Sequence, residues 1–366
     1  MPAALDVADD RPPVRTDAIT RWLLLVAVLI VVMVLVGGFT RLSRAGLSIV
    51  EWDAVTGAVP PIGQTAWERS FAAYQQTPEY RLVNAGMTLA EYQRIFYIEW
   101  AHRLIARIAG LLVVAPLVWF LWRKRLTLRA SLPYWGIAIL FGIQGAIGWV
   151  MVSSGLKDRP VVSHFRLTIH LLTALALLAL VLWMALDRMR SVSTPRRGHD
   201  DAPGAPRVLS WILLGAVVVQ ISFGGLVAGL KAGHVSNTWP LMFGRLVPEG
   251  LLATADTWWA ALTEPLASHW IHRWFAFVVA ALAIGVAVTV RRSNDVTGLA
   301  RSAAGWLLVV VAAQIALGIG VVVFGVPRWL ALAHQGIGVL VFALTLVIVH
   351  ETSARTRAAP IPVPAR

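Results

Sequence analysis

Long apolar runs separated by shorter polar segments dominate the chain. Each run is long enough to cross a bilayer as a helix, which takes about 20 apolar residues. None alternates apolar and polar positions in the manner of a β-barrel strand. The pattern therefore predicts an all-α polytopic membrane protein with eight transmembrane helices, at about 20–38, 99–122, 132–152, 164–186, 208–230, 268–290, 302–325 and 329–350.

Composition supports this prediction and excludes several other classes of protein. The hydrophobic share is 58% and the charged share 14%, against about 45–50% and about 25% in soluble domains. The net charge of +13 would suggest nucleic-acid binding in a soluble protein, but in a membrane protein it reports topology, and we expect no nucleic-acid partner. Cysteine is absent, which excludes disulfides, thiolate-ligated haem and iron–sulfur clusters.

Basic residues gather in the connections after the second, fourth and sixth spans. These clusters are Arg123, Lys124, Arg125 and Arg129, then Arg188, Arg190, Arg196, Arg197 and Arg207, then Arg291, Arg292 and Arg301. Short cytoplasmic connections carry such an excess. The sequence thus predicts a bacterial inner-membrane protein with both termini in the cytoplasm. Segments 39–98 and 231–267 would face the periplasm.

The long 39–98 segment contains two motifs typical of helix starts. Thr65 with Glu68 and Thr88 with Glu91 both have the spacing of a capping box. We expect the second to begin a helix that runs directly into the second span.

The two halves of the chain resemble each other. A shift of 187 residues places Gly37-Gly38 on Gly224-Gly225, a shift of 170 places His102-Arg103 on His272-Arg273, and a shift of 164 places His170 on His334. An even number of spans in each copy makes the copies parallel. We expect two parallel-repeat four-helix bundles, divided as 1–190, a cytoplasmic linker at 191–207, 208–350, and a cytoplasmic tail at 351–366.

Four histidines lie near the outer ends of even-numbered spans, in two repeat-related pairs. They are His102, His170, His272 and His334. A single intramembrane histidine is explained equally well by a hydrogen-bonded helix contact, but four at one depth favour two haem sites with an imidazole on each face of the iron. The pairs would be His102 with His170 and His272 with His334. We interpret His164, His199, His234 and His350 as solvated or interfacial.

The two copies differ beside these histidines. Glu99 stands one turn before His102, whereas His269 occupies the matching place before His272. A carboxylate inside the membrane is costly and usually has a function. The alternative interpretation of Glu99 is a structural ion pair with Arg103. The half with Glu99 has a group able to move a proton. Five arginines could contact haem propionates: Arg103, Arg107, Arg166, Arg273 and Arg328. Alternatively, their long side chains extend to the phosphates of the lipid headgroups.

Several segments resemble the haem A synthase family over about residues 20–350. They are GGFTRLSRAGLSIVEWDAVTGAVPP at 37–61, EWAHRLIAR at 99–107, GGLVAGLKAGHVSNTWPLM at 224–242 and HWIHR at 269–273. The resemblance implies an enzyme that oxidises the C8 methyl of haem O to a formyl group through successive hydroxylations, giving haem A for cytochrome oxidase.

The resemblance also implies roles for particular residues. A haem B cofactor would be held by His272 and His334, substrate haem O by His102 and His170, and the family's essential glutamate would be Glu99, with His269 in a supporting place. Haem O synthase and cytochrome oxidase assembly factors are the implied protein partners, and a homo-oligomer remains open. Some relatives carry an outer-loop cysteine pair that this chain lacks, so a disulfide-linked electron acceptor is excluded and the acceptor is unknown.

If histidines occupy both axial positions, no iron site is open to activate oxygen, and attack of water on the oxidised macrocycle becomes the favoured route.

Two other functions use some of the same features. A di-haem electron-transfer cytochrome would need the same four histidines but not Glu99. A transporter fits the duplicated halves but lacks the broken midplane helices typical of that class.

Overall fold

The computed structural model describes residues 17–53, 56–157, 160–191, 204–251, 258–294 and 296–353. Eight helices in these residues are long and apolar enough to span a membrane, as the sequence predicts. They are α1 (Ala18–Leu42), α4 (Leu89–Trp122), α5 (Leu128–Ser153), α6 (His164–Ser191), α7 (Ala205–Gly229), α9 (Pro265–Arg292), α10 (Gly298–Val323) and α11 (Arg328–Ser353). Most of the expected linker, at 192–203, and the terminal segments 1–16 and 354–366 lie outside the described residues.

The start of α4 confirms one predicted capping box. Thr88 Oγ1 accepts from the main-chain N–H of Glu91, and the Glu91 carboxylate accepts from the N–H of Thr88. The prediction of a capping box at Thr65 and Glu68 is wrong. Helix α2 (Gln64–Gln75) begins one residue before Thr65, and Gly63 occupies the cap position at a φ of 81°, a backbone conformation that glycine adopts readily. Glu68 instead accepts from the side chain of Gln64.

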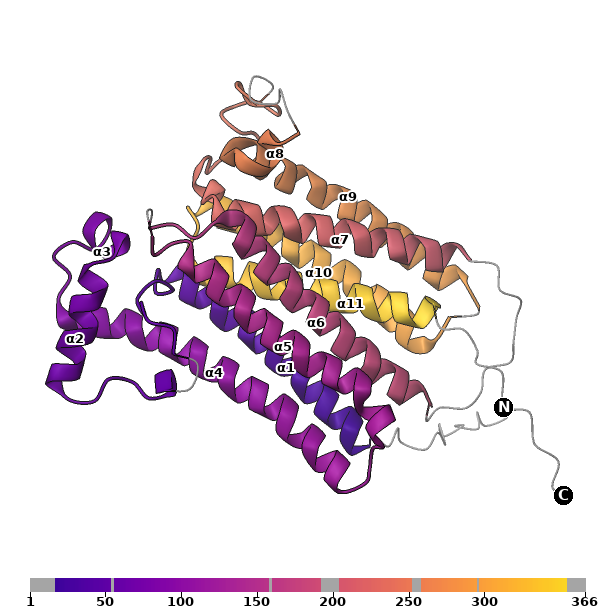
Figure 1. Ribbon diagram of the computed structural model, residues 1–366. Coiled ribbons are helices and arrows are strands. Elements are labelled where there is room, and N and C mark those ends of the chain that lie inside the picture. Colours follow the sequence, from indigo (N-terminus) through magenta and orange to yellow (C-terminus); the bar gives the residue numbers. More distant parts are fainter. Residues whose placement is uncertain are drawn as a thin grey trace, which may run out of the picture.

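Aromatic packing joins α2 and α3 (Pro78–Leu82) to the first turns of α4. Trp67, Tyr74, Tyr92 and Phe96 form a buried cluster, with the rings of Trp67 and Phe96 edge to face at 5.0 Å. Pairs of this geometry contribute about 0.5–1.5 kcal/mol beyond the area they bury. The cluster explains why α4 extends well beyond the bundle on the left of Figure 1.

Helices α1, α4, α5 and α6 contact one another in a ring, and α7, α9, α10 and α11 form a second ring. The two groups meet where α6 packs on α7 and α1 on α11. Small residues allow this close approach: a Cβ on Gly225 would lie 2.8 Å from Oγ1 of Thr168. The side chain of Gln335 reaches across to donate to the carbonyl of Val34 at 2.7 Å.

The elements outside the spans lie at one end of the molecule, which we call the loop end (Figure 1). They are η1 (Thr56–Ala58), α2, α3, η2 (Ala232–His234) and α8 (Ala260–Thr263). At the opposite end, His350 is 1% exposed, and its Nε2 pairs with Oδ1 of Asp187 on α6 at 2.9 Å. The interpretation of His350 as solvated is therefore wrong, because α6 covers it.

Candidate functional site

The four predicted histidines lie in the halves of their helices nearest the loop end, on α4, α6, α9 and α11. The rings of His272 and His334 face each other with centroids 6.3 Å apart and planes at 83°. Two imidazoles bound to one metal through bonds of about 2 Å have centroids about 6 Å apart, so this spacing fits two axial ligands. His102 and His170 are close enough to interact electrostatically. The structure therefore brings together the pairs that the repeat predicts.

A glycine on the neighbouring helix backs each of these rings. A Cβ built on Gly148 would lie 3.0 Å from Cε1 of His170, one on Gly224 3.1 Å from His272, and one on Gly318 2.9 Å from His334. On Gly37 it would lie 3.4 Å from His102. A side chain at the three tighter positions would push the ring away from its place.

We expect Gly318→Ala to lower the haem content of the purified protein about tenfold, the effect of misorienting a metal ligand. The added methyl would meet the ring of His334. The ratio of haem to purified protein measures this. Gly285→Ala on α9 is the matched control, because a Cβ there meets nothing within 4 Å. Equal haem content in the two variants would contradict this role of Gly318.

A glutamine precedes three of these glycines by one helical turn. Gln144 donates to the carbonyl of His170 at 2.9 Å and lies 3.2 Å from its Nδ1. Gln220 makes the same two contacts with His272, at 2.9 and 3.2 Å. Gln314 lies 3.4 Å from Nε2 of His334. These glutamines were not among the predicted site residues, although each precedes its glycine by the same four residues in the sequence.

The second pair of histidines has a further contact that sets the ring nitrogen available to a metal. Nδ1 of His272 lies 3.2 Å from the main-chain oxygen of Gln220, and Nδ1 of His334 lies 3.1 Å from that of Gln314. A carbonyl only accepts, so these contacts are hydrogen bonds when Nδ1 carries the proton, and that tautomer leaves Nε2 for a metal. The amide of Gln220 then donates to the main-chain carbonyl of His272 rather than to the ring. Two imidazole nitrogens, Nε2 of His272 and Nε2 of His334, are ligands that suit the iron of a haem. Among the described residues, no three His, Asp or Glu side chains gather to hold a bare metal ion.

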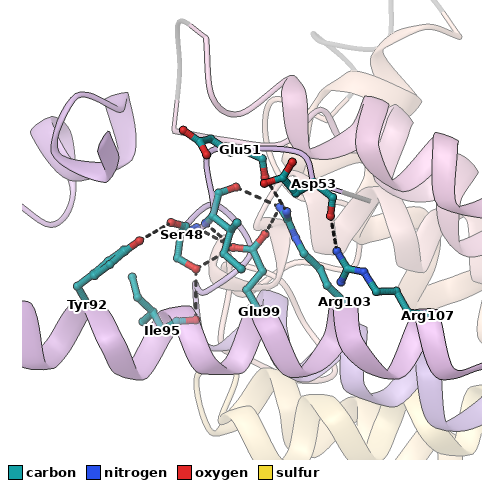
Figure 2. Close-up of polar contacts among 9 residues, drawn as sticks. Ser48, Glu51, Asp53, Tyr92, Ile95, Glu99, Arg103 and Arg107 are labelled. Carbon is teal, nitrogen blue, oxygen red and sulfur yellow. Dashed lines mark hydrogen bonds and ion pairs between the residues drawn. The ribbon is translucent and has the colours of Figure 1, made fainter. Parts of the chain in front are cut away.

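Glu99 is 2% exposed and holds the segment before α2 against α4 (Figure 2). Its Oε2 accepts from the N–H and hydroxyl of Ser48, both at 2.8 Å, and from the N–H of Ile49 at 3.0 Å. Its Oε1 accepts from Nη2 of Arg103 at 2.6 Å. The ion pair that the spacing suggested is therefore present, and three more donors stabilise the buried charge.

Two arginines at matching places stack on matching tryptophans. Arg103 lies 5.7 Å from the ring centre of Trp52, and Arg273 lies 4.9 Å from that of Trp239. Arg273 is 6% exposed, and although Nη2 donates to the carbonyl of Thr238, its Nε and Nη1 have no hydrogen-bond partner among the described residues. A buried cation with unpaired donors needs an anion, and a haem propionate fits this requirement.

The remaining candidates lie around the two pairs. His269 is 2% exposed, and its Nδ1 makes no hydrogen bond within the described part of the chain. Arg107 donates to the carbonyl of Asp53 at 2.6 Å, and Arg166 to that of Val150 at 2.8 Å. Arg328 is the first residue of α11. The structure thus places all the predicted site residues toward the loop end.

Comparison with known proteins agrees with this arrangement. A family described as cytochrome oxidase assembly protein matches residues 20–346. The chain is 41% identical to the heme A synthase of Sphingopyxis alaskensis, with 97% of each chain covered. It is 42% identical to that of Rhodopseudomonas palustris strain HaA2, with 100% of this chain and 99% of the relative covered, and 44% identical to that of Methylobacterium sp. strain 4-46, with 94% and 93% covered. The chain therefore belongs to the haem A synthase family of cytochrome oxidase assembly proteins.

Proposed function

We propose that this protein oxidises the C8 methyl of haem O to a formyl group, giving haem A. His102 and His170 bind the substrate haem, and His272 and His334 bind a resident haem B, which supplies one-electron transfer when bound. The observation that carries this proposal is the difference between two otherwise matching pairs. Glu99 lies beside His102, whereas both Nδ1 atoms of the other pair are held by main-chain carbonyls.

A groove between α5 and α6 supports assignment of the substrate to the N-terminal half. It has a volume of about 290 Å³ and is lined by Ile143, Ala146, Ile147, Val150, Arg166 and Ile169. Where the first half has Arg166, the second has Leu330, which is 6% exposed and packs beside Gly320. In the second half, a buried apolar side chain therefore lies at the position where Arg166 lines the groove of the first half. This difference suits an exchangeable substrate in one half and a permanent cofactor in the other.

The contacts of Glu99 indicate which oxygen takes part in the reaction. Oε2 is occupied by three donors from Ser48 and Ile49, whereas Oε1 has a single donor, Arg103, among the described residues. We assign Oε1 to orienting a water toward the methyl carbon and accepting its proton. Each of the two hydroxylations adds one water oxygen and releases two electrons and two protons, with the electrons passing to an acceptor outside this chain. The resulting geminal diol then loses one water to give the formyl group.

Turnover under labelled oxygen gas tests the water route. We expect the formyl oxygen to carry no label from the gas, because an iron held by both His102 and His170 during the reaction would have no site for oxygen. Label from the gas would overturn this route. Restoration of haem A by this gene in a deletion strain separates the synthase from the di-haem cytochrome, since a cytochrome would retain haem B and restore no haem A.

The location and organisation of the protein belong to the same proposal. The halves 1–190 and 208–350 are repeats of one four-helix unit, with both termini in the cytoplasm of a bacterium and both haem sites toward the periplasm. The short basic connections support this orientation. Haem O synthase and cytochrome oxidase assembly factors are the proposed protein partners. A reporter that is active only outside the cytoplasm, fused after α3 and after α11, tests the orientation.

A further inference from the structure

His102 differs from the other three histidines in having no glutamine beside it. Gln144, Gln220 and Gln314 each lie four residues before the glycine that backs a histidine ring, and the residue four before Gly37 is Met33. Methionine offers no hydrogen-bond donor. The helix register therefore places a thioether where each of the other three sites has an amide.

The ring of His102 is also oriented differently. The closest ring atom to a Cβ on Gly148, Gly224 or Gly318 is Cε1, whereas on Gly37 it is Nε2 of His102. The gap is wider as well, at 3.4 Å against 2.9–3.1 Å. No hydrogen bond to either ring nitrogen of His102 is present among the described residues. Fewer contacts therefore restrain the ring of His102 than restrain the other three rings.

The partner ligand in the same half is held firmly. Gln144 binds the carbonyl of His170, and Thr173 in turn donates to Oε1 of Gln144. Each hydrogen-bonded group therefore restrains the next, and the His170 ring lies against Gly148. The N-terminal pair thus combines one fixed ligand with one that is free to turn.

We propose that Met33 makes His102 the releasable ligand of the substrate haem, a role that rests on the proposed function. Haem O enters onto His170, His102 then turns to close the second face, and the product leaves when His102 turns away. Methionine suits this movement because its apolar side chain fills space and donates no hydrogen bond that would hold the ring. The three glutamines hold the other ligands in place.

Adding the missing amide tests this role. We expect Met33→Gln to slow transfer of haem O to excess haem-scavenging apoglobin about fivefold, the effect of about one hydrogen bond. The protein is used whole, loaded with haem O, and chromatography separates released haem O from haem B. Met33→Leu is the matched control, because leucine is apolar and close in size; it should release haem O at the wild-type rate. Gln220→Met should make the converse change and speed loss of haem B.

A second readout separates a change in ligation from general loosening of the fold. The five-coordinate fraction of bound haem O, measured by its absorption spectrum, should fall in Met33→Gln and stay unchanged in Met33→Leu. Equal release rates in these two variants, with haem B retained in both, would overturn the role of Met33. Slower release in a protein that binds haem O but makes no haem A would support the role and contradict the proposed function.

Discussion

His272→Ala is expected to abolish retention of haem B, lowering its content in purified protein by more than about tenfold. The substitution removes one of the two proposed ligands, while the Gln220 amide keeps its hydrogen bond to the main-chain carbonyl at position 272. Haem B content by extraction and the low-spin absorption bands measure the effect.

Binding of haem O to the other half provides the internal control for His272→Ala. His102 and His170 lie on α4 and α6, outside the ring of α7, α9, α10 and α11, so we expect haem O still to bind. His234→Ala, an exposed histidine at the same end of the molecule, should leave both haems in place. Full retention of haem B in His272→Ala would refute the proposed ligand pair.

Glu99→Gln is expected to lower haem A formation by about 10²–10⁴-fold, the usual contribution of a group that transfers a proton. The amide cannot accept a proton at the place of Oε1, so the attacking water is left without a base. Initial rates of haem A formation from haem O measure the loss. Haem O binding is measured in parallel to show that the pocket is retained.

Ser48→Ala separates this role from a purely structural one. The change removes one hydroxyl donor to Glu99 and loosens the same segment while keeping the carboxylate. We expect haem A formation to fall far less than in Glu99→Gln. A comparable loss in the two variants would make Glu99 a positioning residue for the segment that includes Ser48.

The eight spans are predictable from sequence because each apolar run alone satisfies the length of a bilayer-crossing helix. Local signals also specify the start of α4, since Thr88 and Glu91 are three residues apart and bond each other. The same signal misleads at Thr65, where Gly63 starts the helix earlier. A short-range motif thus predicts the start of a helix only when no nearby residue takes the cap position instead, as Gly63 does here.

Contacts between distant segments explain what sequence analysis missed. Ser48 is 51 residues from Glu99, and Asp187 is 163 from His350, so neither contact has a local spacing to reveal it. The glutamines beside the histidines were missed for another reason. Aligning the two halves draws attention to positions where the residues are identical. Gln220 aligns with Met33, and this difference between the halves is the informative feature.

The glycine that backs each of the four histidines belongs to the same half of the chain as that histidine. The hydrogen bonds that hold His170, His272 and His334 also stay within one half. A substitution beside one pair therefore reaches the other through the packing of α6 on α7 and of α1 and α6 on α11. Such separation lets the surroundings of one pair of histidines change in evolution while those of the other pair stay the same.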